Sequence, residues 1–390
     1  MLTQNKIYLD YGATTPVDPQ VITSMTPYFT NHFGNPSSIH TFGQKAEAAA
    51  EQARISIAIA LNCQPNEVIF TSCGSESDNL ALRGAALAAR KNRNANHLLI
   101  SPVEHHAVLN TAIQLAEIHG FELEYLPVDH YGLVTPADVA SRLRPDTAIV
   151  SVIYANNEIG TINPIAKIGA ICQARGIPFH TDAVQAAPHI HFDIRALNVD
   201  LLSIAAHKFY GPKGVGALFV RSGTPILAVQ TGGGQESGLR SGTLNVANIV
   251  GMADAFDRVR MRLEEFSNRH KAMRDLIIER VISSIPDTKL TGHPQNRLPN
   301  HASFLFKGVD GNLLLMLLDD AGFACSSGSA CKTGDPEPSD VLLALSYPHE
   351  WAFGSLRITL GRQTTQEEIN SLLAILPAIV AKARQETSPA

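Results

Sequence analysis

A lysine at the end of an apolar segment is the first residue in this sequence that could do covalent chemistry. Lys208 follows the strand-like run Leu201–Ala205 and precedes a glycine-rich turn. In open α/β sheets, ligands bind just beyond the carboxyl ends of the strands. A partly desolvated lysine amine at such a place can form a Schiff base with a carbonyl group. The alternative is a solvated turn lysine, which is the commoner case.

A second motif could bind an anion. The segment Thr71–Ser77 follows a predicted strand and opens a predicted helix, whose free N–H groups and dipole favour negative charge. Gly74 would let the backbone approach a phosphate closely, and Ser75 adds a hydroxyl donor. An ordinary N-capped helix is the alternative. The G-x-x-x-x-G-K-[ST] phosphate loop is missing.

Three further polar residues follow predicted strands. Asp182 could keep a bound ring nitrogen protonated, so that the ring accepts electrons. His105 could stack on a ring or move a proton near neutral pH, and Asn157 could bond a ring hydroxyl or a carboxylate. Taken singly, each also fits a capping, surface or turn residue. Their joint position at the strand ends of one sheet favours a shared site.

A small, polar segment near the C-terminus carries the candidate nucleophile. Residues 324–339 are rich in Gly, Ser and Pro, which is typical of a mobile loop. Cys331 in this loop is predicted to be exposed, and the neighbouring Lys332 favours its thiolate. Cys325 is predicted to be packed. Farther on, Arg357 lies in a short strand and could bind a carboxylate with two hydrogen bonds, or form a surface ion pair.

These residues need a sheet to bring them together. Short apolar runs alternate with amphipathic helices, which predicts a mainly parallel sheet covered by helices on both faces. One long helix is predicted from about Asn245 to Ile285, followed by a second αβ pattern and a final helix that begins with a capping box at Thr365. The predicted strands are Glu67–Thr71, His97–Ser101, Thr147–Ala155, Ile177–Asp182, Leu201–Ala205, Gly216–Val220, Ser303–Phe306 and Leu356–Leu360. The predicted domains are a large one over residues 16–260 and a small one formed by residues 1–15 and 261–390.

Composition narrows the class of protein. The 390 residues are 45% hydrophobic and carry a formal net charge of −5, which favours a folded chain without a nucleic-acid footprint. No apolar run is long enough for a membrane span, and the N-terminus shows no leader, so the cytoplasm is expected. Five cysteines, with no C-x-x-C pair, favour neither a disulfide framework nor a metal site.

Several blocks of the sequence, in order along nearly the whole chain, resemble the cysteine desulfurases of the NifS and IscS type. The blocks are residues 8–16, 33–43, the turn around Ser75, Asn156–Gly160, His207–Lys208, Arg240–Thr243, Ser327–Cys331 and Leu356–Arg357. The resemblance implies the pyridoxal 5'-phosphate (PLP) fold of aspartate aminotransferase, with a mainly parallel seven-stranded sheet in the large domain and a smaller α/β domain. It also implies removal of sulfur from L-cysteine, which leaves L-alanine and a persulfide on Cys331 for iron–sulfur cluster assembly or other acceptor proteins.

The resemblance assigns roles to individual residues. Lys208 would bind PLP covalently, and His105 would stack on its ring and assist proton transfer. Cys331 would receive the sulfur and could contact a partner's iron–sulfur cluster. The other implied cofactor ligands are Gly74, Ser75 and His207 at the phosphate, Asp182 at the ring nitrogen, Asn157 and Gln185 at the ring hydroxyl, and Thr243 at the phosphate of the second subunit of a homodimer. The implied substrate ligands are Arg357, Asn157 and Asn35.

Two departures from the family pattern concern the cofactor and the nucleophile. Ala205 stands where a hydroxyl residue is usual, so one hydrogen bond to the phosphate is missing and PLP is expected to bind less tightly. Lys332 replaces a small residue beside Cys331. Two alternatives remain open from sequence: a PLP-dependent cystine or selenocysteine lyase, which needs no loop thiol, and a non-catalytic scaffold of sulfur assembly.

Overall fold

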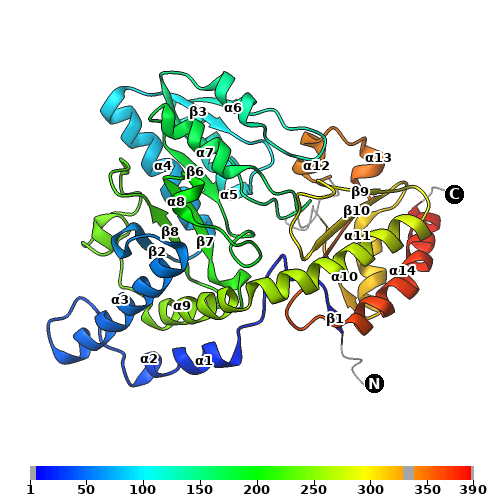
Figure 1. Cartoon of the computed structure of the whole chain (residues 1–390), viewed down its shortest axis with the longest axis horizontal. Helices are drawn as coiled ribbons and strands as arrows, with labels where there is room; N and C mark the ends of the chain where they lie inside the picture. The colour runs from blue at the N-terminus through cyan, green and yellow to red at the C-terminus, as the bar shows by residue number, and fades with distance from the viewer. Residues whose placement is uncertain (1–5, 328–337, 388–390) are drawn as a thin grey trace.

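A twisted seven-stranded sheet forms the centre of the chain in the computed structural model, which describes residues 6–327 and 338–387 (Figure 1). Its strand order is β2-β8-β7-β6-β5-β3-β4, and all neighbours are parallel except β8, which is antiparallel to β2 and β7. The predicted mainly parallel seven-stranded sheet is therefore confirmed. The strands are β2 (Val68–Thr71), β3 (His97–Ile100), β4 (Glu122–Tyr125), β5 (Thr147–Ser151), β6 (Phe179–Asp182), β7 (Leu201–Ala205) and β8 (Gly216–Val220).

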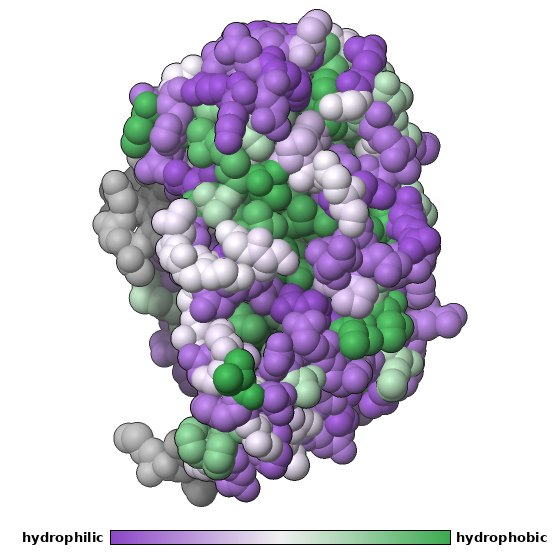
Figure 2. Space-filling view, turned by 90° about the vertical axis from the view of Figure 1, so that its left-hand side faces the viewer, coloured by the Kyte–Doolittle hydropathy of each residue, from purple (hydrophilic) through white to green (hydrophobic). Residues whose placement is uncertain are grey.

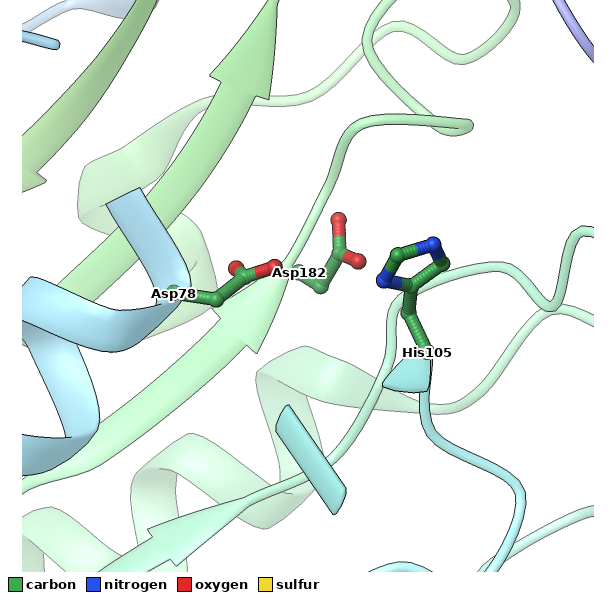
Figure 3. Close-up of side chains that lie close together, drawn as sticks. All are labelled: Asp78, His105 and Asp182. Carbon is green, nitrogen blue, oxygen red and sulfur yellow. The ribbon is translucent and has the colours of Figure 1, made fainter. Parts of the chain in front are cut away.

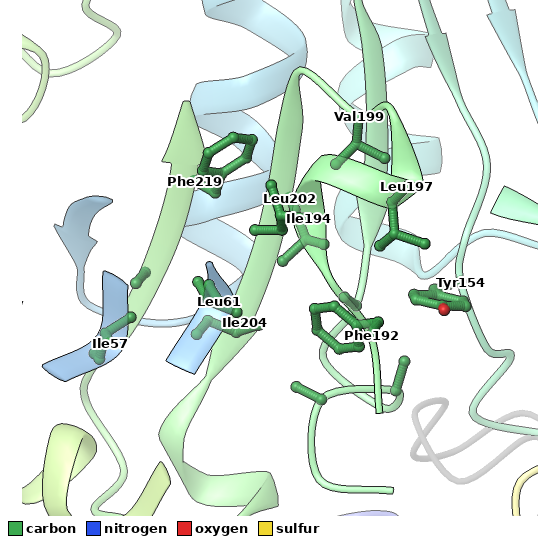
Figure 4. Close-up of a cluster of buried hydrophobic side chains, with 14 of the residues drawn as sticks. Ile57, Leu61, Tyr154, Phe192, Ile194, Leu197, Val199, Leu202, Ile204 and Phe219 are labelled. Carbon is green, nitrogen blue, oxygen red and sulfur yellow. The ribbon is translucent and has the colours of Figure 1, made fainter. Parts of the chain in front are cut away.

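Helices cover both faces of this sheet because its side chains alternate between two apolar layers. Leu201 and Leu218 pack with α4 and α5, whereas Leu202 and Phe219 pack with α3 and α9. Figure 4 shows part of the second layer, where sheet residues meet side chains from the helices. The helices of this part are α1 (Pro19–Met25), α2 (Pro27–Thr30), α3 (Thr41–Leu61), α4 (Gly74–Arg93), α5 (His106–His119), α6 (Pro136–Arg142), α7 (Ile165–Ala174), α8 (Ile194–Leu197) and α9 (Val246–Met261).

A smaller sheet of order β12-β10-β9 forms a second core, which α10, α11 and α14 cover. The first strand of the chain, β1, pairs in parallel with β11 beside this core. The predicted capping box at Thr365 is present, because Thr365 and Glu368 bond each other's backbone N–H. The elements are β1 (Ile7–Tyr8), β9 (Thr288–Leu290), β10 (His301–Phe306), β11 (Phe323–Ala324), β12 (Ser355–Thr359), α10 (Leu263–Ser284), α11 (Gly311–Asp320), α12 (Asp340–Ala344), α13 (His349–Ala352) and α14 (Gln366–Thr387).

The long helix predicted between Asn245 and Ile285 is two helices. Arg262 leaves the helical conformation, with φ −117° and ψ 14°, and separates α9 from α10. The break lets α9 pack against α1 and α3, while α10 packs against β9, β10 and α14. Sequence periodicity did not show this, because both halves are amphipathic and neither Gly nor Pro marks the boundary. Among the residues described, no helix combines the length and apolar character that a membrane crossing needs.

A buried ion pair fastens the segment before α9 to the edge of the large sheet. The Glu236 carboxylate accepts two hydrogen bonds from the Arg54 guanidinium, at 2.7 and 2.8 Å, and one from the backbone N–H of Phe70. Arg54 also donates to the Val68 carbonyl at 2.6 Å. Both side chains are almost fully buried, so each charge depends on the other.

Replacing Arg54 by Met should therefore lower the free energy of unfolding by about 3–5 kcal/mol, because the Glu236 carboxylate would stay buried without its counter-charge. The double variant Arg54→Met/Glu236→Gln should lose clearly less, since it removes both charges. Urea unfolding of the three proteins measures this difference. A loss below about 1 kcal/mol in the single variant would contradict the assigned role.

Candidate active site

A cavity of about 560 Å³ opens at the carboxyl ends of β6 and β7 and at the start of α4. It lies where the topology of an open α/β sheet places a ligand. Most of the predicted site residues form its wall together. The lining residues are Asp10, Gly12, Ala13, Cys73, Gly74, Ser75, Asp78, His105, Ile153, Asn157, Glu158, Asp182, Val184, Gln185, Ala205, His207, Lys208, Ser326, Ser327 and Arg357.

One end of the cavity is built for an anion. Cys73 is the residue before α4, so the free N–H groups at the start of a 20-residue helix face this end. A Cβ atom at Gly74 would stand 2.8 Å from Val184 Cγ2, so any other residue there would force the surroundings to shift. Burial, together with the charges of Lys208 and Lys213, lowers the pKa of His207 to about 4, so its ring is neutral.

The opposite wall is acidic. Asp182 ends β6, and its Oδ1 accepts a hydrogen bond of 2.8 Å from the Val184 N–H. Burial, together with the neighbouring Asp78, raises the pKa of Asp182 to about 6. One oxygen of each carboxyl group and a ring nitrogen of His105 lie within 4.8 Å of one another (Figure 3). A carboxylate at this depth can hold a protonated ring nitrogen.

His105 lies at the rim of the acidic wall, immediately before α5. Its Nδ1 accepts a hydrogen bond from the Ala107 N–H at 3.1 Å, so a neutral ring carries its proton on Nε2. Burial lowers the pKa of His105, and the Lys208 charge also lowers it, while Asp182 acts in the opposite sense. The ring is therefore suited to hold or move a proton near neutral pH.

The Lys208 amine reaches the cavity from the 3₁₀ turn η2 (Ala206–Lys208) after β7. Its Nζ donates to the carbonyl oxygens of Gly12 and Ala13, at 2.6 and 2.7 Å. The Gln185 amide also donates to the Gly12 carbonyl, at 2.8 Å. Sequence reasoning did not include Gly12 or Ala13 in the site, because a backbone carbonyl has no residue type that could reveal it.

Arg357 closes the side of the cavity that faces the small sheet. From β12 it donates to the Asn157 carbonyl at 3.0 Å and to Asp10 Oδ1 at 2.8 Å. Its third donor, Nε, is buried and has no hydrogen-bond partner among the residues described. Sequence reasoning missed Asp10, although its position in the Tyr8–Pro16 block was a usable signal. A guanidinium with a spare donor can bind a carboxylate.

The two ends of the cysteine loop meet this cavity, although Cys331 itself lies outside the described residues. Ser326 exchanges two backbone hydrogen bonds with Arg357, and Ser327 lines the cavity. At the far end, Ser339 donates to a carboxylate oxygen of Glu158, which is also in the cavity wall. Cys325 packs against the small core, and burial raises its thiol pKa to about 12, as expected for a structural cysteine.

Two predicted ligands, Asn35 and Thr243, do not line the cavity of their own chain. Asn35 is exposed and bonds the Ser37 N–H, and Thr243 is exposed beyond the Glu236 segment. Their assignment stays a prediction that requires a second subunit. Ala205 is buried in the cavity wall, and its methyl group stands 3.5 Å from the Cβ position of Gly74, at the anion end.

The residues present fit PLP. The cavity combines an anion-binding helix start that a Cβ atom would crowd, a buried carboxylate for a ring nitrogen, and a lysine amine between them. This donor set matches the three functional parts of PLP: its phosphate, its ring nitrogen and its aldehyde.

Comparisons with known proteins agree with this geometry. The class-V aminotransferase family matches residues 7–372. The chain is 46% identical over 386 residues to the cysteine desulfurase IscS of Clostridium botulinum (strain Hall), covering 98% of this chain and 96% of that protein. It is 47% identical over 381 residues to the cysteine desulfurase IscS of Dictyoglomus turgidum, with the same coverage. A solved NifS-like protein superposes with a TM-score of 0.89 at 34% identity, covering 97% of this chain and 100% of that one.

The fold and the site therefore place this chain in the class-V aminotransferase family. Within it, the chain belongs to the PLP-dependent cysteine desulfurases, as its full-length relatives show. The resemblance seen in the sequence blocks is confirmed. A further solved relative, SspA in complex with cysteine, superposes with a TM-score of 0.79 at 35% identity, covering 90% of this chain and 98% of that one.

Because Ala205 faces the anion end, Ala205→Ser should add a hydrogen bond to the cofactor phosphate. A bond to a charged group is worth about 1.5–3 kcal/mol, so the dissociation constant for PLP should fall by roughly tenfold or more. Fluorescence titration of the apoenzyme with PLP measures the change. Ala13→Ser, which adds a hydroxyl beside Lys208 instead, serves as the control. Equal affinity in wild type and Ala205→Ser would show that residue 205 does not reach the phosphate.

Proposed function

We propose that this desulfurase passes the sulfur of L-cysteine to the Cys331 thiol, giving L-alanine and an enzyme persulfide. The observation that carries the proposal is the shared cavity. The Lys208 amine, the Asp182 carboxylate, the Arg357 guanidinium and the first residues of the Cys331 segment all face it. A lyase without a loop thiol would not need the cysteine segment there.

The substrate carboxylate is assigned to Arg357, with Asn157 beside it. The buried Nε of Arg357 has a donor to spare, and Asp10 and the Asn157 carbonyl fix the other two nitrogens in one plane. A fixed guanidinium loses little entropy when it binds a carboxylate. The bound cysteine named in the solved SspA relative supports an amino-acid substrate. Asn35 is proposed as a further contact from the second subunit.

The cofactor is assigned to the wall between α4 and β6. Gly74, Ser75 and His207 would hold its phosphate, Asp182 its ring nitrogen, Asn157 and Gln185 its hydroxyl side, and Lys208 its aldehyde carbon. When bound, PLP supplies a conjugated ring that accepts the electrons left on the substrate's Cα when its proton is removed. Asp182 then holds the proton on the ring nitrogen, which keeps the ring an effective electron acceptor.

Two groups are positioned to move the substrate's Cα proton. The Lys208 amine is held at the cavity by the Gly12 and Ala13 carbonyls. The His105 ring is kept neutral by burial, and its Nδ1 is engaged by the backbone, so that Nε2 is the nitrogen for proton transfer. The buried residues Ser326 and Ser327 and the Glu158 side chain form part of the wall around the same space.

The length of the chain allows Cys331 to act at this cavity. Cys331 lies four positions after Ser327 in the sequence, and four residues span at most about 14 Å. On the other side of the loop, Ser339 is fastened to Glu158 and caps α12, where it accepts from Val341 and Leu342. Both ends of the loop are thus fixed near the substrate. A thiol there can take the substrate sulfur and then carry it to an acceptor.

A homodimer is proposed as the active form. Four large apolar side chains at the start of α3 and before it are 56–93% exposed: Phe29, Phe33, Ile39 and Phe42. Figure 2 looks onto the side of the molecule that carries α2 and α3, where hydrophobic residues gather among hydrophilic ones. Exposed apolar groups on this scale are typical of an interface. A second copy there would explain why Asn35 and Thr243 do not reach their own cavity.

The sulfur acceptor is proposed to be an iron–sulfur scaffold or another sulfur-using protein, in line with the IscS names of the relatives. The division into domains of residues 16–260 and of residues 1–15 with 261–390 is likewise proposed; the two separate hydrophobic cores support it. Location in the cytoplasm stays a prediction.

Replacing Cys331 by Ala should abolish persulfide formation and lower alanine release from L-cysteine by at least a hundredfold, because no acceptor thiol would remain. Alanine and protein-bound persulfide are measured together in single-turnover experiments. Cys325→Ala is the matched control, since that thiol is buried with a raised pKa and should not carry sulfur. Alanine release at the normal rate in Cys331→Ala would instead support a lyase.

Because Thr243 is assigned to the cofactor phosphate of the other subunit, two chains with different defects should complement each other in a mixed dimer. Thr243→Ala should weaken PLP binding at both sites of a homodimer. Co-expression with Lys208→Ala, under different affinity tags, should restore tight binding at one site in each mixed dimer, because the second chain supplies the intact Thr243. PLP content of the doubly purified dimer measures this. A monomer in sedimentation, or a mixed dimer without restored binding, would rule out the assignment.

A further inference from the structure

The acidic wall of the cavity contains more carboxyl groups than one cofactor ring needs. Asp78 lies in the second turn of α4, is 1% exposed and lines the cavity beside Asp182. Its Oδ1 is buried and has no hydrogen-bond partner in the described part of the chain. Figure 3 shows the two carboxyl groups side by side, with His105 beyond Asp182. Asp78 has no part in the proposed chemistry, so its burial calls for another explanation.

A histidine is the basic group that the structure places in contact with Asp78: the Nε2 atom of His180 lies 3.5 Å from Asp78 Oδ1. The His180 ring is fully buried, and its two nitrogens are engaged by Ser151 and Ser203 at 2.8 and 3.1 Å. Burial lowers the pKa of His180 to about 4, so this ring is neutral and supplies no counter-charge to Asp78.

The remaining neighbours make ionisation of Asp78 more costly. Glu104 is 2% exposed, and within residues 6–327 and 338–387 one of its oxygens has no hydrogen-bond partner either. Two buried like charges in one low-dielectric site repel each other strongly. The titratable groups that face Asp78 are His180 and Asp182 of β6 and Glu104 and His105 of the segment after β3, with Lys208 acting on His105.

We propose that Asp78 is a positioning residue for the cofactor ring: on the acidic side of neutrality its carboxyl group is neutral beside the Asp182 carboxylate, so that a single negative charge faces the ring nitrogen. A proton on Asp78 removes the cost of a buried, unsatisfied anionic oxygen. It also leaves Asp182 free to act as the one anion. The inference rests on the proposed placement of the ring nitrogen at Asp182.

The shift of the Asp78 pKa agrees with this arrangement. Burial raises it from 3.8 to about 7, and a hydrogen bond from Ser203 opposes the rise. The carboxyl group is therefore neutral below this pH and ionises above it. As the pH rises through neutrality, a second negative charge appears behind Asp182 and strengthens the attraction for a proton on the ring nitrogen. The Asp78 carboxyl group is thus uncharged when the pH is below about 7.

Nitrogen NMR of the holoenzyme, reconstituted with PLP that carries ¹⁵N in its ring, tests the proposal. Wild type, Asp78→Asn and Asp182→Asn are compared between about pH 6 and about pH 9. At the lower pH, Asp78→Asn should match wild type, because an amide resembles a neutral carboxyl group. At the higher pH, the wild-type signal should stay at the value of a protonated ring, while that of Asp78→Asn should move toward the value of an unprotonated ring, because the variant lacks the second negative charge. The visible absorption of the bound cofactor should diverge in the same pH range.

Three results would overturn the inference. A changed ring signal in Asp78→Asn already at the lower pH would show that Asp78 is an anion throughout. Identical signals in the two proteins at every pH would show that Asp78 does not act on the ring. Failure of Asp78→Asn to fold or to bind PLP would also contradict a neutral group that an amide can replace. If instead Asp182→Asn leaves the ring signal unchanged, the placement of the ring nitrogen itself is wrong.

Discussion

The parallel direction of β3, β5, β6 and β7 is the constraint on which the rest of this structure depends. Parallel strands end at one edge of a sheet, and the connections after them must turn there. His105, Asn157, Asp182 and Lys208 each follow one of these four strands, so they meet although up to 103 residues of chain separate them. The cavity is a consequence of topology first and of side-chain chemistry second.

The antiparallel strand β8 and the helix α4 add the anion-binding end of the cavity. β8 follows β7 through the turn after Lys208 and pairs with β2, so the start of α4 is brought beside the lysine. Polar groups at this edge are costly to bury unless they find partners. Lys208 donates to backbone carbonyls, Asp182 accepts from a backbone N–H, and Arg357 donates to Asp10. The site is therefore held in place largely by main-chain groups.

Much of this arrangement could be predicted from the sequence, for a physical reason. Fully buried strands such as Leu201–Ala205 and Gly216–Val220 are short apolar runs with clear ends, and both coincide with β7 and β8. Residue types with few structural uses at a strand end, such as Lys208, mark the site. Gly12 and Ala13 could not be found, because they act through their carbonyl oxygens. Asp78 could not be found either, because its position depends on how α4 packs on β6 and β7. The break at Arg262 could not be predicted, because two consecutive amphipathic helices show the same periodicity as one long helix.

The contact between the two ends of the chain has a consequence for how the protein is made. Arg357 reaches Asp10, 347 residues earlier, and Thr359 binds the N–H of Gly12. During synthesis, Asp10 and Gly12 leave the ribosome more than 300 residues before β12 and must wait for it. The large sheet can form while the chain is still growing, since its strands all precede residue 221. The cavity cannot be completed until β12 has been synthesised, so a finished site for the cofactor forms only after the strands of the large sheet are available.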